Sequence, residues 1–553
     1  IITMNTPEGD TTYSYGNNGN LLAISDSSGT ISRSYDALNR VTSYQDVNGN
    51  TIRYQYDAVG NLTGLIYPDG KTVYYSYDAV NRLTRVRDWA GRETSYSYDA
   101  NGRLVKTVRP DGSIETRSYD AAGELTQLKD QDANANIISQ YDYAYDANGN
   151  VVSEKSAVSS VPYTGKNITM IYGAGNQLNN FNGQSITYDA DGNMTIGTLN
   201  DKISDFTYDS RNRLTKAGDN SYGYDPENNR ISQGEGTAFT SYVLNPQAPL
   251  SQILQIKTGS NTSYCVYGLG LLGIEDADGN YQVYHYDRRG STVAITNMTG
   301  AITDTFSYGP YGELANHTGG TATPFLYNGK DSVMTDANGL YYMRARYYQP
   351  EIKRFINQDV LLGNIADSKT LNRYAYVKGQ PVNLVDPWGL KGQSVTSSVY
   401  SAGSGITSNI YNREFGNVST EVTTTKQDWL GYTGVSGKYS GQLFGNFQGE
   451  GNFAIGAVVE HDEDFDTLKI GAGVTPLNIK YKDNYQGDYT NISWNAGVWS
   501  PGSFGGVFSI STSNQEAANR GVLGFKMGGD IFGVKAGFSY QFNVGRYFRD
   551  MFK

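Results

Sequence analysis

The 553-residue chain is poor in the side chains that build metal centres and disulfides. It holds one cysteine, Cys265, and three histidines, His285, His317 and His461, which lie far apart in the sequence. A single cysteine excludes an intrachain disulfide framework and a cysteine-based metal site. The scattered histidines predict no histidine cluster either, so we expect neither a metal nor an organic cofactor.

The chain also lacks long apolar runs, and its acidic residues outnumber its basic ones. No run approaches the roughly 18 to 20 residues of a membrane-spanning helix, and the start, IITMNTPEGD, has no signal-peptide pattern. Because Ile1 falls almost directly into a repeat, we expect the chain to be a fragment without its N-terminal part. The formal net charge of −11 argues against general nucleic-acid binding.

Tyrosine and glycine are abundant instead. The sequence contains 46 Tyr and 65 Gly, with 38% apolar residues. That composition is too aromatic for a disordered chain and too poor in Leu, Ala and Lys for a helical one. Gly and Asn clusters between Tyr- and Thr-rich stretches predict many short strands joined by tight turns.

An internal repeat dominates the first part of the chain. Tyr-Asp pairs begin at Tyr35, Tyr56, Tyr77, Tyr98 and Tyr119, and each step is 21 residues. The pattern then loosens through pairs at Tyr145, Tyr188, Tyr208, Tyr224 and Tyr286. Such a fixed period is the signature of a repeat architecture.

Each repeat unit predicts a hairpin. Thr72, Tyr74 and Ser76 alternate in strand fashion before a Tyr-Asp pair, and the Asp can accept hydrogen bonds from backbone N–H groups of the next turn. Asn39 or Gly60, three residues after an Asp, tolerates the positive φ of tight turns. One hairpin cannot bury its own face, so neighbouring units must stack.

These registered repeats resemble the YD repeats of Rhs proteins, the C component of insecticidal Tc toxins, bacterial wall-associated toxins and teneurins. The resemblance covers roughly residues 11–390. It implies an all-β fold, in which hairpins coil into a spiral sheet that forms a partial or closed shell. The Tyr-Asp residues would then be architectural.

Three further segments resemble the Rhs core. They are HYDRRGSTVAITNMTG at 285–300, GLYYMRARYYQPEIKRFINQD at 339–359 and NRYAYVKGQPVNLVDPWGL at 372–390. In the family this region is an intramolecular aspartic protease that cuts after the Leu of a DPxGL motif. The motif here comprises Asp386, Pro387, Trp388, Gly389 and Leu390.

The resemblance implies catalytic roles for Asp386 and Asp359, assistance by Arg354, and a cut between Leu390 and Lys391. The chemistry is reasonable, because two nearby carboxylates share a proton. The ionised one can then activate water, while the protonated one polarises the scissile carbonyl. The alternative is that Asp386 only forms a turn and Asp359 only caps a strand.

The sequence departs from the usual family pattern at three positions. Val360 replaces a Pro, Gln349 stands where an Asp is common, and Gly379 stands where an Asn is common. These departures concern the competence of the protease and not the identity of the fold.

Composition changes after Leu390, which suggests four segments. We predict a YD-repeat shell over 1–284, the Rhs core over 285–390, a Ser/Thr/Gly-rich linker over 391–426 and a C-terminal β domain over 427–553. In the last segment, residues 492–498 and 538–544 alternate with the two-residue period of half-buried strands. By family position, this domain would be the effector.

No motif assigns a chemistry to the tail. His461 with the acidic run 462–466 could be a calcium loop or a solvated hairpin tip, and Glu460 beside His461 is a weak acid–base candidate. The basic residues near the C-terminus form only a short cluster; they are Arg546, Arg549 and Lys553. Gly-rich strands could instead make a membrane-active β pore former, although most alternating runs reach only about seven or eight residues, short of a span.

Two functions stay open from the sequence. The first is a secreted or cell-surface polymorphic toxin, whose shell encloses an effector and whose partners would be a cognate immunity protein, a secretion machinery or N-terminal shell portion, and a target-cell component or membrane. The second is a cell-surface YD-repeat adhesin or carbohydrate-binding protein. A cut site followed by an unrelated domain favours the toxin.

Overall fold

The computed structural model describes residues 3–157, 163–363, 367–390 and 392–394, together with strands between 418 and 536. These described residues form β-strands and short 3₁₀ turns without an α-helix, which confirms the all-β prediction. None of their helical turns is long and apolar enough to cross a membrane. The chain divides into two compact units, Ile1–Gly403 and Ser404–Lys553.

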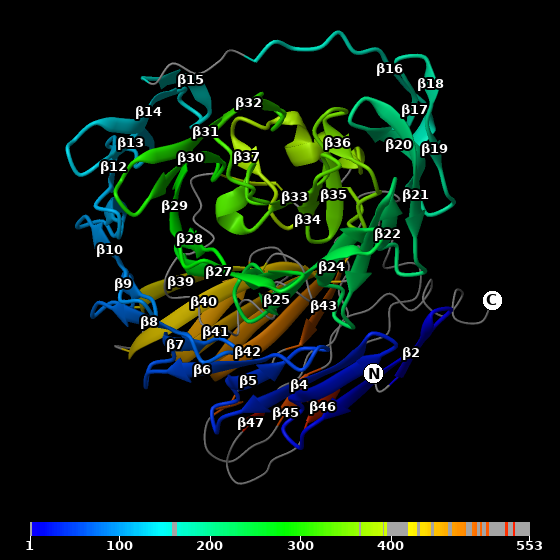
Figure 1. The fold of residues 1–553 in the computed structure, drawn as a ribbon. Coiled ribbons are helices and arrows are strands. Elements are labelled where there is room, and N and C mark those ends of the chain that lie inside the picture. The colour runs from blue at the N-terminus through cyan, green and yellow to red at the C-terminus, as the bar shows by residue number, and fades with distance from the viewer. Residues whose placement is uncertain are drawn as a thin grey trace. The chain divides into compact units, whose positions relative to one another are not determined.

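The repeats form one long antiparallel sheet in which each strand pairs with its neighbours in chain order (Figure 1). Its strands are β1 (Thr3–Thr6), β2 (Gly9–Tyr15), β3 (Leu21–Asp26), β4 (Gly29–Tyr35), β5 (Val41–Gln45), β6 (Thr51–Tyr56), β7 (Leu62–Ile66), β8 (Thr72–Tyr77), β9 (Leu83–Arg87), β10 (Glu93–Tyr98), β11 (Leu104–Val108), β12 (Ile114–Tyr119), β13 (Leu125–Gln131), β14 (Ile137–Tyr145) and β15 (Val151–Ser156).

From β4 to β14, every second strand ends at the Tyr of a Tyr-Asp pair. The Asp and the Tyr of a pair form different hydrogen bonds. The Asp36 carboxylate accepts hydrogen bonds from the backbone N–H groups of Leu38 and Arg40, both at 2.9 Å, and Asn39 has a φ of 61°. The predicted Asp turn is therefore confirmed. The Tyr35 hydroxyl donates to the carbonyl of Leu21, 2.8 Å away, in the strand before the preceding turn. The Tyr thus ties its strand to the neighbouring one.

The same contacts recur one unit later, and an Arg links the units. Arg40 Nε binds the Asp36 carboxylate at 2.6 Å, and its Nη1 donates to the Asp57 carbonyl at 2.9 Å. The Arg40 guanidinium also lies over the Tyr56 ring, 4.7 Å from the centroid. The repeated spacing of Tyr and Asp, with Arg at position 40, therefore follows from contacts within and between hairpins.

A second antiparallel sheet follows, again with strands paired in chain order, and neither sheet closes on itself in the part of the chain described. Its strands are β19 (Thr187–Tyr188), β20 (Met194–Leu199), β21 (Lys202–Tyr208), β22 (Leu214–Ala217), β23 (Asn220–Tyr224), β24 (Arg230–Glu235), β25 (Ala238–Asn245), β26 (Gln252–Thr258), β27 (Asn261–Gly268), β28 (Gly270–Glu275), β29 (Tyr281–Tyr286), β30 (Thr292–Asn297), β31 (Ile302–Tyr308) and β32 (Leu314–Thr318). Along the chain, the two sheets are separated by β16 (Met170–Tyr172), η1 (Ala174–Asn176), β17 (Leu178–Phe181) and β18 (Gln184–Ser185).

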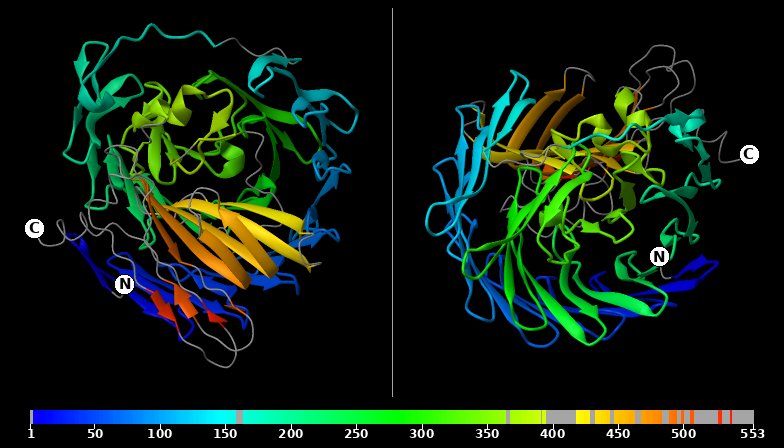
Figure 2. Two further views of the ribbon diagram at one scale, coloured as in Figure 1. Left: turned by 180° about the vertical axis from the view of Figure 1, so that it is seen from behind. Right: turned by 45° about the horizontal axis from the view of Figure 1, so that its top comes forward.

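The two sheets lie side by side, as both views of Figure 2 show. The turn residue Tyr67 donates its hydroxyl hydrogen to the Cys265 carbonyl at 2.6 Å. Farther along, Glu275 forms ion pairs with Lys71 and Arg92. Apolar side chains of both sheets merge into one buried cluster. Stacking between successive stretches of hairpins thus supplies the core that one hairpin lacks.

Two of the three signature segments, 339–359 and 372–390, fold within the curve of the second sheet together with the residues around them (Figure 1). They form η2 (Gly329–Asp331), β33 (Met334–Thr335), β34 (Tyr341–Met343), β35 (Arg346–Gln349), β36 (Arg354–Phe355), η3 (Ser368–Leu371), η4 (Tyr376–Gly379), β37 (Leu384–Val385) and β38 (Gln393–Ser394). Buried hydroxyls fasten them to the sheet, since Tyr341 and Tyr348 donate to the carbonyls of Gly312 and Tyr311.

The second unit is described only through its strands. These are β39 (Val418–Gln427), β40 (Tyr432–Leu443), β41 (Phe447–Asp462), β42 (Thr467–Lys482), β43 (Tyr489–Trp494), β44 (Val498–Trp499), β45 (Gly505–Val507), β46 (Lys526–Gly528) and β47 (Lys535–Ala536). They pair antiparallel, which agrees with the predicted C-terminal β domain.

Three details of the predicted organisation differ from the structure. His285 lies inside β29, so the second sheet continues across the boundary drawn at 284/285. Strand β39 begins at Val418, within the predicted linker. Strands β40, β41 and β42 contain 12, 16 and 16 residues, longer than the seven or eight expected. Gly and Ser residues interrupt the apolar alternation of these strands, so the sequence pattern did not predict their full length.

Candidate autoproteolytic site

The site is assembled from three short pieces of backbone that meet beside β35. Asp359 follows β36, and Asp386 directly follows β37. The chain then passes through the DPWGL segment and returns as β38, because Val385 pairs antiparallel with Gln393. The predicted scissile bond therefore lies in the connection between β37 and β38; Lys391 itself is outside the described residues.

Arg346 joins the two predicted catalytic carboxylates. Its Nη2 lies 2.8 Å from Asp359 Oδ2 and 3.6 Å from Asp386 Oδ2. All three residues are buried, with exposed fractions of 4% for Arg346, 9% for Asp359 and 1% for Asp386. The structure thus brings together two carboxyl groups that are 27 positions apart in the sequence. Sequence reasoning missed Arg346, although it stands in the signature segment 339–359.

The surroundings shift the protonation of the pair. Burial raises the pKa of Asp359 to about 6; the Arg346 guanidinium only partly offsets this effect, and the neighbouring Asp386 reinforces it. Burial also lowers the pKa of Arg346, against the influence of both carboxylates. A carboxyl group with a pKa near neutrality can hold a proton that its neighbour does not, as acid–base chemistry requires.

The backbone of DPWGL folds tightly around Asp386. The Leu390 N–H donates to Asp386 Oδ1 at 3.0 Å, and the Gly389 N–H donates to the Asp386 carbonyl at 3.1 Å. Gly389 has a φ of 68°, and a Cβ there would come within 2.3 Å of the Met343 carbonyl oxygen. Only glycine fits this position, both for its φ and for its space. Asp386 therefore shapes the segment that would be cut.

Arg354 does not lie where the resemblance placed it. Its Nη1 donates to the Asn176 carbonyl at 2.7 Å, and its guanidinium lies over Tyr172 and Tyr374. The strand register explains this position. Arg354 pairs with Gln349, which lies on the opposite face of β35 from Arg346 because side chains alternate along a strand. The cation beside the carboxylates is Arg346, which corrects the assignment of Arg354.

The departures from the family pattern lie outside this triad of side chains. Gln349 is buried and donates to the Thr198 carbonyl at 2.7 Å. Gly379 ends η4 with a φ of 74°. Val360 is 72% exposed, directly after Asp359.

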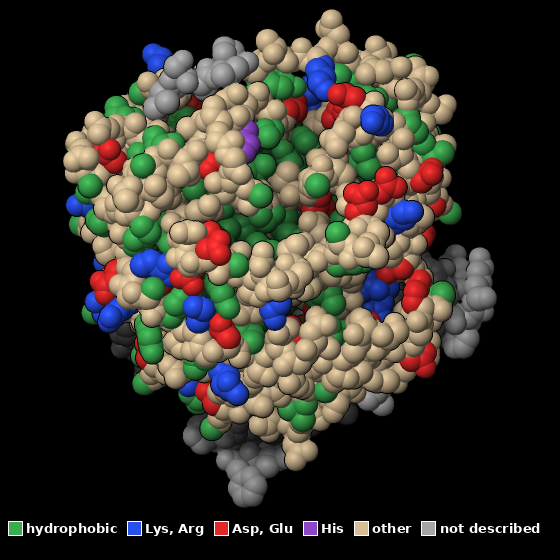
Figure 3. All heavy atoms as spheres, in the orientation of Figure 1, with side chains coloured by type: hydrophobic (Ala, Val, Ile, Leu, Met, Phe, Trp, Pro, Cys, Tyr) green, Lys and Arg blue, Asp and Glu red, His purple; other side chains and the backbone are tan. Residues whose placement is uncertain are grey.

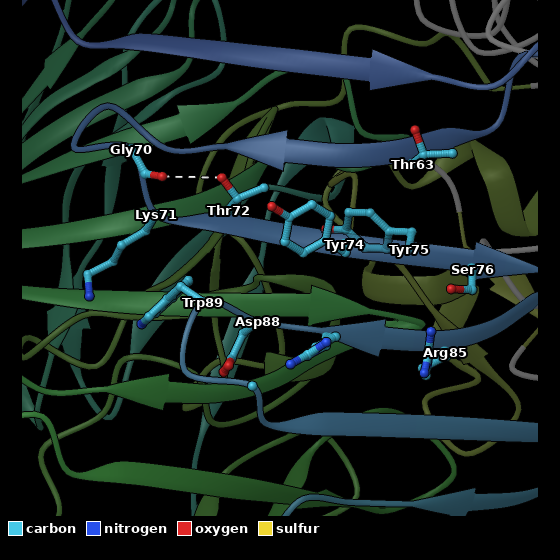
Figure 4. A pocket seen from close by; sticks show the side chains of 12 residues that line it. Thr63, Gly70, Lys71, Thr72, Tyr74, Tyr75, Ser76, Arg85, Asp88 and Trp89 are labelled. Carbon is cyan, nitrogen blue, oxygen red and sulfur yellow. Dashed lines mark hydrogen bonds between the residues drawn. The ribbon is translucent and has the colours of Figure 1, made fainter.

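A surface hollow lies elsewhere, on β7, β8 and β9 (Figure 4). Its volume is about 730 Å³. Tyr74, which is 53% exposed, stands among polar side chains, and the side chains of Arg85 and Arg87 are 51% and 57% exposed. On the face that Figure 3 shows, acidic and basic side chains are interspersed over the surface.

The candidate residues of the tail are mostly outside the described part. His461 and Glu460 lie in β41, whereas residues 463–466, 538–544 and the C-terminal basic cluster fall outside the described residues. Among the residues that the structure describes, no three His, Cys, Asp or Glu side chains gather as a possible metal site.

Comparison with known proteins matches the chain to YD-shell proteins. The family model Teneurin YD-shell matches residues 106–382, and the model RHS Repeat matches residues 35–72 and 77–114. The tRNA nuclease WapA of Bacillus subtilis (strain 168) is 28% identical over 258 residues, which cover 45% of this chain and 11% of that protein. The double-stranded DNA deaminase toxin A of Burkholderia cenocepacia (strain H111) is 26% identical over 297 residues, 45% of this chain and 19% of that one.

A solved structure has the same fold. The crystal structure of TcdB2-TccC3 without the hypervariable C-terminal region superposes with a TM-score of 0.55 at 18% identity, over 70% of this chain and 25% of that one. The chain thus spans less than a fifth of the length of the two curated relatives named above. The Teneurin YD-shell model alone accounts for half of the sequence. Repeats, fold and family model agree, and the chain belongs to the YD-shell family of Rhs-repeat proteins.

Proposed function

We propose that this chain is the C-terminal part of a toxin that cleaves itself between Leu390 and Lys391. The observation that carries the proposal is the buried meeting of Asp359 and Asp386 at one guanidinium nitrogen of Arg346. Burial raises the pKa of Asp359 to about 6, so this carboxyl can hold a proton while its neighbour is ionised.

The reaction would be a hydrolysis with one water molecule. Asp359 holds the proton and Asp386 is ionised. Asp386 takes a proton from the water molecule, and the water oxygen bonds to the Leu390 carbonyl carbon. Asp359 then gives its proton to the departing Lys391 nitrogen, and the C–N bond breaks. The products are a Leu390 carboxylate and a Lys391 amine. Because catalyst and substrate are one chain, proximity supplies much of the rate, and one turnover suffices.

The shell and tail fit delivery of an effector. The relatives include proteins named a tRNA nuclease and a deaminase toxin, and the fold neighbour has a C-terminal region described as hypervariable. We infer that residues 391–553 are the effector, that the protein is secreted or displayed at the cell surface, and that a cognate immunity protein protects its producer. A tail that acts on membranes stays a candidate, since β41 and β42 exceed the roughly nine to eleven residues of a spanning strand.

Separate carboxylate variants test the protease. Asp386→Asn and Asp359→Asn should each leave the chain uncut, whereas the parent separates into two fragments on a denaturing gel. Asp367→Asn is the matched control, because Asp367 is half-exposed and pairs with Lys378 at 2.6 Å, outside the site. Cleavage in both site variants would refute the proposal.

The hollow on β7–β9 favours a second function, carbohydrate binding at the shell surface. An exposed tyrosine ring beside several hydroxyl groups (Figure 4) suits an acidic sugar, which could stack on the ring. Its carboxylate could pair with Arg85 or Arg87 in place of their present partner, Glu93. Binding to an array of acidic glycans that Tyr74→Ala abolishes would support this function, and an array without any bound sugar would contradict it.

A further inference from the structure

The segment before the proposed cut is held by three consecutive residues, Arg344 and Ala345 of the turn between β34 and β35 and Arg346 at the start of β35. The contacts run in order: the carbonyl oxygens of Pro387, Trp388 and Gly389 accept hydrogen bonds from Arg344 Nη1 at 2.6 Å, from Ala345 N at 3.1 Å and from Arg346 Nε. The three carbonyls that precede Leu390 in the chain thus all accept hydrogen bonds from one short stretch of backbone and side chains, residues 344–346.

Arg344 anchors this turn to the surrounding shell. Its Nη2 donates to the carbonyls of Ser251 and Asp331, at 2.9 and 2.7 Å, and its Nε donates to the Ser251 hydroxyl at 3.2 Å. The guanidinium also lies 5.9 Å from the centre of the Trp388 ring. One side chain therefore connects the segment to be cut, the loop between β25 and β26, and η2.

The backbone at Arg344 is strained, and the strain is informative. Its φ is 56°, in the left-handed region that favours glycine. Met343 pairs with Arg346, so Arg344 occupies the first position of a two-residue hairpin turn, where glycine is the common choice. A strained non-glycine residue persists when its side chain contributes something that glycine cannot. Here that contribution is the set of hydrogen bonds to Pro387 and the shell.

We propose that Arg344 is a positioning residue for self-cleavage, which holds DPWGL in register so that the Leu390–Lys391 bond meets the two carboxyl groups. The inference rests on the proposed autoproteolysis and adds to it a substrate-binding element outside the catalytic group. The guanidinium of Arg344 donates hydrogen bonds to the Pro387 carbonyl and to Ser251 and Asp331 of the shell. It acts through the backbone of the segment to be cut.

Arg344→Gly separates positioning from folding, because glycine relieves the strained φ while the clamp is lost. We expect cleavage to slow by on the order of 100-fold, the cost of a misplacement of about 1 Å. The thermal midpoint of an Asp386→Asn background should change little. Arg344→Lys should restore part of the rate, because an ammonium group can reach one carbonyl but not several. The pH profile should keep its shape, since the carboxyl pair and Arg346 are intact.

Lys353→Gly is the matched control. Lys353 is also a cation at positive φ, 59°, in the adjoining turn between β35 and β36, and its ammonium lies 3.9 Å from Glu313 and away from DPWGL. The Lys353→Gly variant should cleave itself at the parent's rate. The rates are measured in chains made by cell-free translation, and mass spectrometry identifies the new ends.

Each result bears on a different statement. If Asp386→Asn abolishes cleavage while Arg344→Gly and Arg344→Lys both cleave at the parent's rate, the clamp is refuted and the protease stands. If Arg344→Gly does not fold, Arg344→Lys decides the matter alone, because it keeps the aliphatic stem. If the parent is never cut, the protease is refuted and the clamp with it.

Discussion

The protonation of Asp359 makes self-cleavage sensitive to pH. Burial raises the pKa of this carboxyl to about 6, and in the proposed reaction Asp359 must carry the proton that the Lys391 nitrogen receives. As far as Asp359 sets the rate, cleavage should therefore be fastest below pH 6 and should slow as the pH rises. Asp359 ionises in that range, and the proton is then no longer available.

The size of the effect follows from the shifted pKa. Above it, the protonated fraction falls roughly tenfold for each pH unit, so the rate at pH 8 should be about a tenth of the rate at pH 7. Stability should change with the same sign. The folded protein binds this proton more tightly than the unfolded chain, whose Asp has a pKa of about 3.9, and roughly 3 kcal/mol of unfolding free energy is lost between about pH 4 and pH 7.

The assay starts from chains translated without cells at pH 8 and moved into buffers from pH 5 to 9. Quenched samples give the cleavage rate from the ratio of cut to uncut chain. The stability change is measured by urea unfolding of Asp386→Asn, which stays uncut. The change should be smaller in this variant, because the Asp386 charge no longer helps to raise the pKa of Asp359. A rate that is flat or rises between pH 6 and 8 would refute the assignment of Asp359 as the proton donor.

Three other variants test the site's backbone, a buried ion pair and a repeat unit. Gly389→Ala should abolish cleavage, as seen on a gel, because its Cβ would lie 2.3 Å from a backbone oxygen. Asp336→Ala should cost about 3 to 5 kcal/mol in urea unfolding, since it leaves the fully buried Arg230 without its 2.7 Å ion-pair partner. Tyr77→Phe should cost about 1 kcal/mol, because its hydroxyl donates to the Leu62 carbonyl at 2.9 Å in a repeat unit.

The repeats and their turns could be predicted because they are local. The hydrogen bonds of Asp36 reach only as far as Arg40, and a period of 21 residues fixes where each turn falls. The partner of each Tyr hydroxyl could not be predicted in the same way. Tyr35 reaches Leu21 across a strand pair, and that contact depends on the register between β3 and β4, which sets Ala23 opposite Ser32.

The candidate site was only partly predictable for the same reason. Motif resemblance gave Asp359 and Asp386, which the fold brings to one guanidinium. It gave Arg354 and missed Arg346, which stands in the same signature segment. The pairing of Gln349 with Arg354 decides between them, since it puts Arg354 on the face of the hairpin away from the carboxylates.

The most direct test of self-cleavage is the intact mass of the purified protein beside its Asp386→Asn variant. We predict two species in the parent, residues 1–390 ending in the Leu390 carboxylate and residues 391–553 beginning with the Lys391 amine, and one uncut species in the variant. A single uncut mass in both would contradict the account, and the shell would then have to act as one intact chain.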